Sequence, residues 1–190
     1  MISRITLVRH GRSAHTSGGW FDAAALNRWF EEYDAAGIQE NSHPPPMLIE
    51  HARHAGIVVA SDMPRARASA ERLLPGVAIP LSQLLREIPL PMPPFGSIRL
   101  PLSAWALAAG TRWAYAQWRG ARPMPRALEQ GEAAAAWLIE LAAVHGSVLA
   151  VNHANLRTLI ARALLDAGWQ REPGGKQLAH WSAWTFTRET

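Results

Sequence analysis

The sequence predicts an α/β fold, a three-layer α/β/α sandwich around a mainly parallel central sheet. Short apolar, strand-like runs at 2–9, 57–62 and 147–151 alternate with segments whose apolar residues recur at helical spacing. Strands that alternate with helices form a parallel sheet, and the helices cover both of its faces. With 190 residues, the chain is long enough for a single domain over 1–190 with a sizeable core.

The first half of the chain holds three expected helices. Leu26, Trp29 and Tyr33 lie on one helical face and predict a helix over 21–36, followed by a short helix over 47–55. After the second strand, Pro64 begins a helix that ends before Pro75-Gly76. A short strand is expected over 77–81.

The second half repeats the alternation. Helices are predicted over 102–118, over 126–145 and directly after His153, and a last strand is predicted over 180–187. The segments 19–55 and 89–125 have the least strand character. We expect these two segments to form a lid around the ends of the strands.

The composition excludes several classes of protein. The chain has no cysteine, which excludes disulfides, thiolate metal sites, iron–sulfur clusters and a cysteine nucleophile. No apolar run is long enough to span a membrane, and the first residues lead into a strand instead of a signal peptide, so we expect a cytoplasmic protein with no membrane partner. The net charge is +4 and the arginines are scattered, which gives no nucleic-acid footprint.

Three predicted strands end in chemically active side chains. Arg9 and His10 follow the first strand, Asp62 follows the second with Arg65 one turn later, and His153 follows the third. The carboxyl ends of parallel strands meet at one edge of a sheet, so these side chains should meet there. Arginines stabilise the charge that develops in phosphoryl transfer, and a neutral imidazole can act as the nucleophile. We expect the neighbouring cations to keep His10 neutral.

Four stretches match the motifs of one known family in the family's order. They are LVRHGRS at 7–13, ASDMPRARASAE at 60–71, LLREI at 84–88 and AVNHANLR at 150–157. In these stretches the sequence resembles the histidine phosphatase superfamily, branch one, which includes the cofactor-dependent phosphoglycerate mutases. The resemblance implies a phosphoglycerate mutase-like fold and a metal-independent phosphatase that hydrolyses a small phosphomonoester and needs no cofactor.

The resemblance also implies roles for individual residues. His10 is the nucleophile that accepts the phosphoryl group, and Arg9 and Arg65 bind the phosphoryl oxygens. His153 is the second histidine of the pocket and contacts the same group. Glu87 is the proton donor to the leaving oxygen and later the base toward water, which contributes about 10²–10⁴-fold to the rate.

Further candidates surround these positions. Ser13 meets the family pattern and Arg12 directly follows Gly11, so we expect both at the phosphate-binding rim. Asp62 and Glu31 are the rival carboxylates for the proton donor. The sequence departs from the family pattern at Thr16, Asp62, Ser69 and Ala154, which alters the rim but none of the expected phosphate contacts.

The other histidines do not predict a metal site. His51 and His54 have helical spacing, but no third ligand lies near them in the sequence, so we expect no bound metal. The remaining histidines are interpreted as surface, cap or edge residues; they are His15, His43, His145 and His180.

Several of the nine tryptophans fall in the expected lid, at Trp20, Trp105, Trp113 and Trp118. We interpret them as packing residues. Two alternatives stay open: the Trp-rich segment 100–118 lines an apolar substrate pocket, or it forms the interface of a homodimer.

Three other functions stay open beside hydrolysis: a phosphoglycerate-type mutase, a protein phosphohistidine phosphatase, and a non-catalytic phosphate-binding scaffold. The family's mutases are longer and bind a second phosphate with lysine and arginine, whereas Lys176 is the one lysine here. A non-catalytic scaffold needs no nucleophile, so the presence of His10 and its neighbours argues against that function. A protein substrate needs an open pocket, whereas the insertion at 89–125 predicts a covered one.

Overall fold

A six-stranded sheet forms the centre of the molecule. The computed structural model describes residues 2–16, 18–89, 92–93, 95–119, 125–174 and 179–189, without the side chains of 113 and 116–118. The strands lie in the order β4-β3-β6-β1-β8-β7, and their bounds are β1 Ile2–Arg9, β3 Ile57–Ser61, β4 Leu81–Ser82, β6 Ser147–Asn152, β7 Gln170–Arg171 and β8 Ala183–Glu189. The first four strands of that order are parallel, and β8 is antiparallel to β1.

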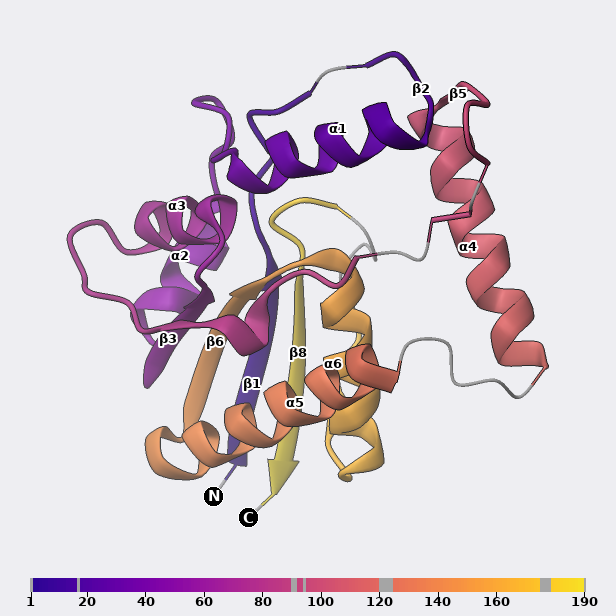
Figure 1. Cartoon of the computed structure of the whole chain (residues 1–190). Helices are drawn as coiled ribbons and strands as arrows, with labels where there is room; N and C mark the ends of the chain where they lie inside the picture. The colour runs from indigo at the N-terminus through magenta and orange to yellow at the C-terminus, as the bar shows by residue number, and fades with distance from the viewer. Residues whose placement is uncertain are drawn as a thin grey trace.

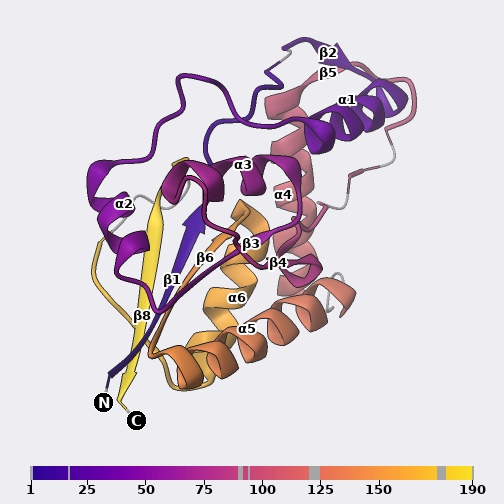
Figure 2. The ribbon, with the colours of Figure 1, turned by 90° about the vertical axis from the view of Figure 1, so that its left-hand side faces the viewer.

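Helices cover both faces of this sheet (Figure 1, Figure 2). On one face lie α5 (Pro125–His145) and α6 (Ala154–Asp166), whose apolar residues form a core with Ile5 and Leu7 of β1. On the other face lie α2 (Pro46–Arg53) and α3 (Pro64–Leu73), which pack with Val8. Successive residues of a strand point to opposite faces, so one strand supplies both cores. The predicted three-layer α/β/α sandwich is confirmed.

The ends of the elements follow local chemistry. Proline stands at the first position of α2, α3 and α5, where its missing N–H costs no helical hydrogen bond. The strand expected over 77–81 is reduced to β4, which begins only at Leu81 and leads into the 3₁₀ turn η1 (Gln83–Leu85). The last strand begins at Ala183 instead of 180, because Trp181 adopts a left-handed φ of 61° that a strand cannot contain.

A small substructure lies beyond the carboxyl ends of the parallel strands. The strand β2 (Trp20–Phe21) pairs with β5 (Leu100–Pro101), and the helices α1 (Ala23–Ala35) and α4 (Leu102–Trp118) follow them. In Figure 1, α1 lies above the sheet and α4 stands to the right. The expected lid over 19–55 therefore divides, because α2 packs against the sheet as part of the core.

The tryptophans of this substructure have different surroundings. Trp105 is fully buried, and its indole N–H donates to the Phe21 carbonyl at 2.8 Å, so Trp105 is a packing residue as predicted. Trp20 is 62% exposed. The side chains of Trp113 and Trp118 lie outside the described residues. Among the described helices, none is long and apolar enough to cross a membrane.

Candidate active site

His10 lies at the carboxyl end of β1 and is 1% exposed. Its ring Nδ1 lies 2.7 Å from the carbonyl oxygen of Gly11. A carbonyl only accepts hydrogen bonds, so Nδ1 carries the proton and Nε2 keeps its lone pair. Burial, with smaller contributions from the cations Arg65 and Arg9, lowers the pKa of His10 to about 3. The predicted neutral state is present, but burial is its main cause, ahead of the neighbouring charges.

Gly11 turns the chain sharply after His10. Its N–H donates to the Ser69 hydroxyl at 2.8 Å, which ties the turn to α3. A Cβ at this position would lie 2.6 Å from the Trp181 ring and 2.8 Å from the Ser42 hydroxyl. No larger residue fits without displacing these groups. The close approach of Trp181 fixes the loop that presents His10.

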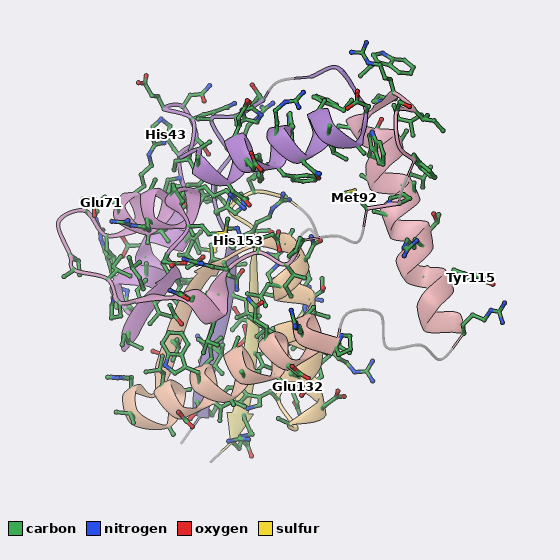
Figure 3. All side chains as sticks on the ribbon, in the orientation of Figure 1. His43, Glu71, Met92, Tyr115, Glu132 and His153 are labelled. Atoms are coloured by element: carbon green, nitrogen blue, oxygen red, sulfur yellow. The ribbon has the colours of Figure 1, made fainter. Side chains whose placement is uncertain are left out.

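His153 lies at the end of β6 and is fully buried (Figure 3). Its ring centre is 5.0 Å from that of His10. Within the described part of the chain, neither of its ring nitrogens has a hydrogen-bond partner. Burial lowers the pKa of His153 well below its ordinary value, and His10, Arg65 and Arg9 add to that shift. Buried polar atoms without partners are rare in folded proteins, and here they mark a place for a ligand.

Arg65 lies in the first turn of α3 and is fully buried. Its Nη1 donates to the Asp34 carboxylate and to the Tyr33 carbonyl, both at 3.1 Å, and its guanidinium lies over the Tyr33 ring at 4.4 Å. Arg9, at the end of β1, is half-buried. Both arginines are close enough to lower the pKa of both histidines. The structure thus brings Arg9, His10, Arg65 and His153 to one edge of the sheet.

Glu87 follows η1 and faces the beginning of α6. Its carboxylate accepts hydrogen bonds from the backbone N–H groups of Ile88 at 3.0 Å and of Asn155 and Leu156 at 3.1 Å each. Burial raises its pKa, while these hydrogen bonds and the charge of Arg65 oppose the increase. The pKa of Glu87 is thus raised by burial even though α3 places the cation Arg65 near it.

The rival carboxylates have different environments. Asp62 binds Arg86 through both carboxylate oxygens, at 2.7 and 2.6 Å, and this contact lowers its pKa. An ionised, paired carboxylate is a poor proton donor. Glu31 lines a cavity together with Glu87. Of the two rivals, only Glu31 faces the same space as Glu87.

The expected rim residues lie on the loop after Gly11. The Ser13 hydroxyl is buried and accepts a hydrogen bond from the backbone N–H of His15 at 3.2 Å. Arg12 is exposed, and its charge helps to lower the pKa of His180. Arg12 therefore lies on the His180 side of the site, while the Ser13 hydroxyl supports the loop itself.

His180 is a site residue that sequence reasoning missed, since it was interpreted as a surface or edge residue. Its ring centre lies 5.8 Å from that of His10, and burial, followed by the charges of Arg9 and Arg12, lowers its pKa to about 4. Because β8 is antiparallel to β1, its beginning lies beside the end of β1. Backbone hydrogen bonds join Trp181 and Ser182 to Arg9 at that point. A prediction that the last strand runs antiparallel to the first would have placed His180 beside His10.

A cavity of about 550 Å³ adjoins this group of side chains. It lies between α1, α3 and the segment after η1, and its polar lining includes Arg65, Glu87, Asn155, Glu31 and Asp34. Arg65 and Glu87 both line the cavity, and Arg65 also lies close enough to the two histidines to lower their pKa. This space is where the rest of a ligand would lie if its anionic group contacted the two histidines.

The pair His51 and His54 forms no metal centre in the described structure. His54 bonds through Nδ1 to the carbonyl oxygen of Glu50 at 2.8 Å. Across the described ranges, no three His, Cys, Asp or Glu side chains come together in a way that could hold a metal ion.

No protein-family model matches the chain, and no curated protein matches it in sequence. Solved structures match it in three dimensions. Mycobacterial hydrolase 2 has a TM-score of 0.61 at 18% identity over 98% of this chain and 82% of its own. A mutant phosphoserine phosphatase from Entamoeba histolytica in complex with phosphoserine has a TM-score of 0.58 at 13% identity. The match covers 96% of this chain and 89% of that protein. Mycobacterial glucosyl-3-phosphoglycerate phosphatase with VO3 has a TM-score of 0.54 at 21% identity. The match covers 86% of this chain and 82% of that protein.

Two of these neighbours are phosphatases by name, and the third is a hydrolase. The likeness covers most of this chain and most of each neighbour, which makes it a likeness of the whole domain. At these identities it is a statement about fold. The chain therefore shares the fold of these neighbours, a mixed α/β fold around a mostly parallel six-stranded sheet.

Proposed function

We propose that this protein is a metal-independent phosphatase that hydrolyses a small phosphomonoester through a phosphohistidine on His10. The observation that carries the proposal is the buried pair of neutral imidazoles beside two guanidiniums. The bond from Nδ1 to the Gly11 carbonyl leaves the Nε2 lone pair of His10 for attack. The ring nitrogens of His153 have no partner within the described chain. The fold shared with known phosphatases supports the same activity.

The first chemical step transfers the phosphoryl group to the protein. Nε2 of His10 attacks phosphorus and forms a P–N bond, while the P–O bond to the leaving alcohol breaks. The proton of Glu87 goes to the leaving oxygen. Arg9, Arg65 and His153 stabilise the charge on the three equatorial oxygens, which is the largest part of catalysis in phosphoryl transfer.

The second step returns the protein to its starting state. Water attacks phosphorus, its proton goes to the Glu87 carboxylate, and the P–N bond breaks to release inorganic phosphate. The raised pKa of Glu87 suits a group that must give and take a proton in one cycle. The guanidiniums supply the positive charge that a metal supplies in other phosphatases.

Hydrolysis of p-nitrophenyl phosphate by the wild type and by His10→Ala tests the proposal. We expect turnover in the wild type that a chelator does not reduce, and none in the variant. Denaturation during turnover of a labelled ester should trap an acid-labile, base-stable phosphoryl group that His10→Ala lacks. A His51→Ala variant, changed on the exposed face of α2, should keep full turnover. Equal turnover in wild type and His10→Ala would exclude this mechanism.

A mutase would behave differently in one measurement. With a phosphorylated glycerate and a second glycerate acceptor, a mutase moves label between the two, whereas a phosphatase releases it as inorganic phosphate. We expect release alone, because the described lining of the cavity beside Arg65 holds three carboxylates and no further arginine or lysine that could bind another phosphate. Label in the acceptor would favour the mutase.

A further inference from the structure

The cavity beside Arg65 and Glu87 has an unusual balance of charge for a site that binds phosphorylated compounds. Two carboxylates of α1, Glu31 and Asp34, line it together with Glu87. Among its described lining residues, the one cation is Arg65. In the proposed reaction that guanidinium binds the phosphoryl group. The part of the cavity that would hold the leaving alcohol is therefore lined by negative charge.

Arg65 connects the two parts of the site. One of its nitrogens donates to Asp34 at 3.1 Å, while its Nε is buried and has no hydrogen-bond partner within the described chain. A bound phosphoryl group would supply acceptors for that nitrogen and would neutralise the guanidinium. Once Arg65 is neutralised by the substrate, nothing else described in the lining balances the charges of Asp34 and Glu31.

The remaining lining accepts a small organic group. Phe30 and Met92 are apolar, and the amides of Asn27 and Asn155 offer hydrogen-bond donors and acceptors. The volume, about 550 Å³, is that of a pocket for a small molecule. Figure 3 shows Met92 on the segment that runs between α1 and the sheet toward α4. The lining thus suits a polar alcohol with a short carbon skeleton.

From this arrangement we propose that the site selects phosphomonoesters whose leaving alcohol is cationic or uncharged, with amino alcohols favoured, and disfavours alcohols that carry a carboxylate or a second phosphate. An ammonium group would contact Glu31 and Asp34 directly. A carboxylate in the same place would be repelled by both, which is a common way to exclude a wrong ligand. This inference rests on the proposed phosphatase function, since it assigns the substrate class of the same site.

Three esters of similar size test the selectivity: phosphoethanolamine, glycerol 3-phosphate and 3-phosphoglycerate. Their leaving alcohols carry a positive charge, no charge and a negative charge. We expect kcat/KM to fall in that order, by about tenfold for each step at low salt. The ratios should shrink as ionic strength rises, because the carboxylates of α1 are exposed.

Variants of α1 assign the selectivity to its carboxylates. Glu31→Gln should reduce the preference for phosphoethanolamine over 3-phosphoglycerate several-fold, and Glu31→Lys should reverse it. Glu32→Gln is the matched control, because Glu32 is the next residue of the same helix and its carboxylate is directed to His15 at 3.8 Å. The control removes the same charge and should leave the ratios unchanged.

Binding measured without turnover separates this inference from the proposed function. In His10→Ala, calorimetric affinities for the three esters should keep the order cationic, uncharged, anionic, and Glu31→Lys in that background should reverse it. If the order holds and no ester is hydrolysed by the wild type, the phosphatase proposal fails alone. If 3-phosphoglycerate binds as tightly as phosphoethanolamine, or if Glu31→Lys leaves the order unchanged, the selectivity proposal is overturned.

Discussion

At the residue scale, the protonation of the site follows from burial. The pKa of His10 is about 3 and that of His153 is also lowered, and in both cases desolvation is the largest cause. Desolvation penalises the charged form of any group, so it lowers the pKa of a histidine and raises that of Glu87. The same burial thus favours the neutral form of both kinds of group, the imidazole that attacks and the carboxyl group that donates a proton.

Glu87→Gln tests how much the departure of the leaving alcohol depends on a proton from Glu87. We expect the variant to hydrolyse an alkyl phosphate about 10²–10³-fold more slowly, because the alkoxide leaves poorly without a proton. The rate of p-nitrophenyl phosphate hydrolysis should fall much less, because nitrophenolate is a stable leaving group. Inhibition by inorganic phosphate should persist. Equal losses on both esters would show that the substitution disturbs α6, which Glu87 caps, instead of removing a proton donor.

The pH profile should follow from the same two groups. His10 stays neutral down to about pH 3, so no activity limb near pH 6.5 should belong to it. Activity that needs the protonated form of Glu87 falls as the pH rises through its raised pKa. We expect an alkaline limb in kcat for alkyl esters that Glu87→Gln abolishes. An alkaline limb retained in that variant would assign the limb to another group.

We expect substitution of His180 to reduce activity less than substitution of His10 or His153. Its ring lies 5.8 Å from that of His10, and its pKa is lowered to about 4, so it is a neutral neighbour at neutral pH. We expect His180→Ala to raise KM several-fold with little change in the amount of trapped phosphohistidine. His145→Ala, an exposed residue at the end of α5, serves as the control. Complete loss of the phosphohistidine in His180→Ala would place His180 in the chemistry instead.

At the element scale, the site depends on how closely α5 and α6 pack behind it. A Cβ on Gly131 of α5 would lie 2.7 Å from the Cβ of Leu159 and 3.3 Å from its backbone carbon. Neither atom is the end of a flexible side chain, so the two helices would have to separate. Since His153 directly precedes α6 and Glu87 caps the beginning of that helix, the position of α6 also sets part of the site.

Gly131→Ala should therefore lower the free energy of unfolding by about 1–3 kcal/mol. Gly110→Ala in α4 is the matched control: a Cβ there meets nothing within 4 Å, and alanine favours a helix by up to about 1 kcal/mol. Urea unfolding of both variants measures the difference. If Gly131→Ala were as stable as the wild type, the helices would be able to accommodate the added methyl group.

At the scale of the whole molecule, the buried neutral histidines make stability depend on pH. The pKa of His10 falls from an ordinary 6.5 to about 3 on folding, and that of His153 also falls. Below pH 6.5 the unfolded chain binds protons that the folded chain does not, so stability is complete above pH 6.5 and is lost as the pH falls toward 3. Each of these histidines contributes up to about 1.4 kcal/mol per pH unit in that range.

Urea unfolding at several values between pH 6.5 and 5 should show this loss. His10→Gln should reduce the slope by up to about 1.4 kcal/mol per unit, since it removes one of the histidines whose pKa falls on folding; the others are His153 and His180. His51→Gln, at an exposed position of α2, should leave the slope unchanged. A slope that His10→Gln and His153→Gln both leave untouched would mean that these histidines are protonated in the folded protein.

The sequence by itself determined the order of the helices and of the main strands, without the two-residue strands β2, β5 and β7, and it determined the chemistry at the strand ends. Periodicity marks helices, and the reactive side chains at three strand ends meet because parallel strands finish at one edge. These rules are local, so they brought Arg9, His10, Arg65 and His153 together without coordinates. They do not extend to a strand of unknown direction, which is why His180 was interpreted as a surface, cap or edge residue.

Only the tertiary structure decided what surrounds that edge. The antiparallel pairing of β8 brings His180 to His10, and the position of α1 brings Glu31 and Asp34 to the cavity beside Arg65. It also decided that Arg65 lies near Glu87 and that Asp62 binds Arg86. Contacts of this kind join residues that are distant in the chain, and their distances and burial depend on how whole elements pack, which no local pattern encodes.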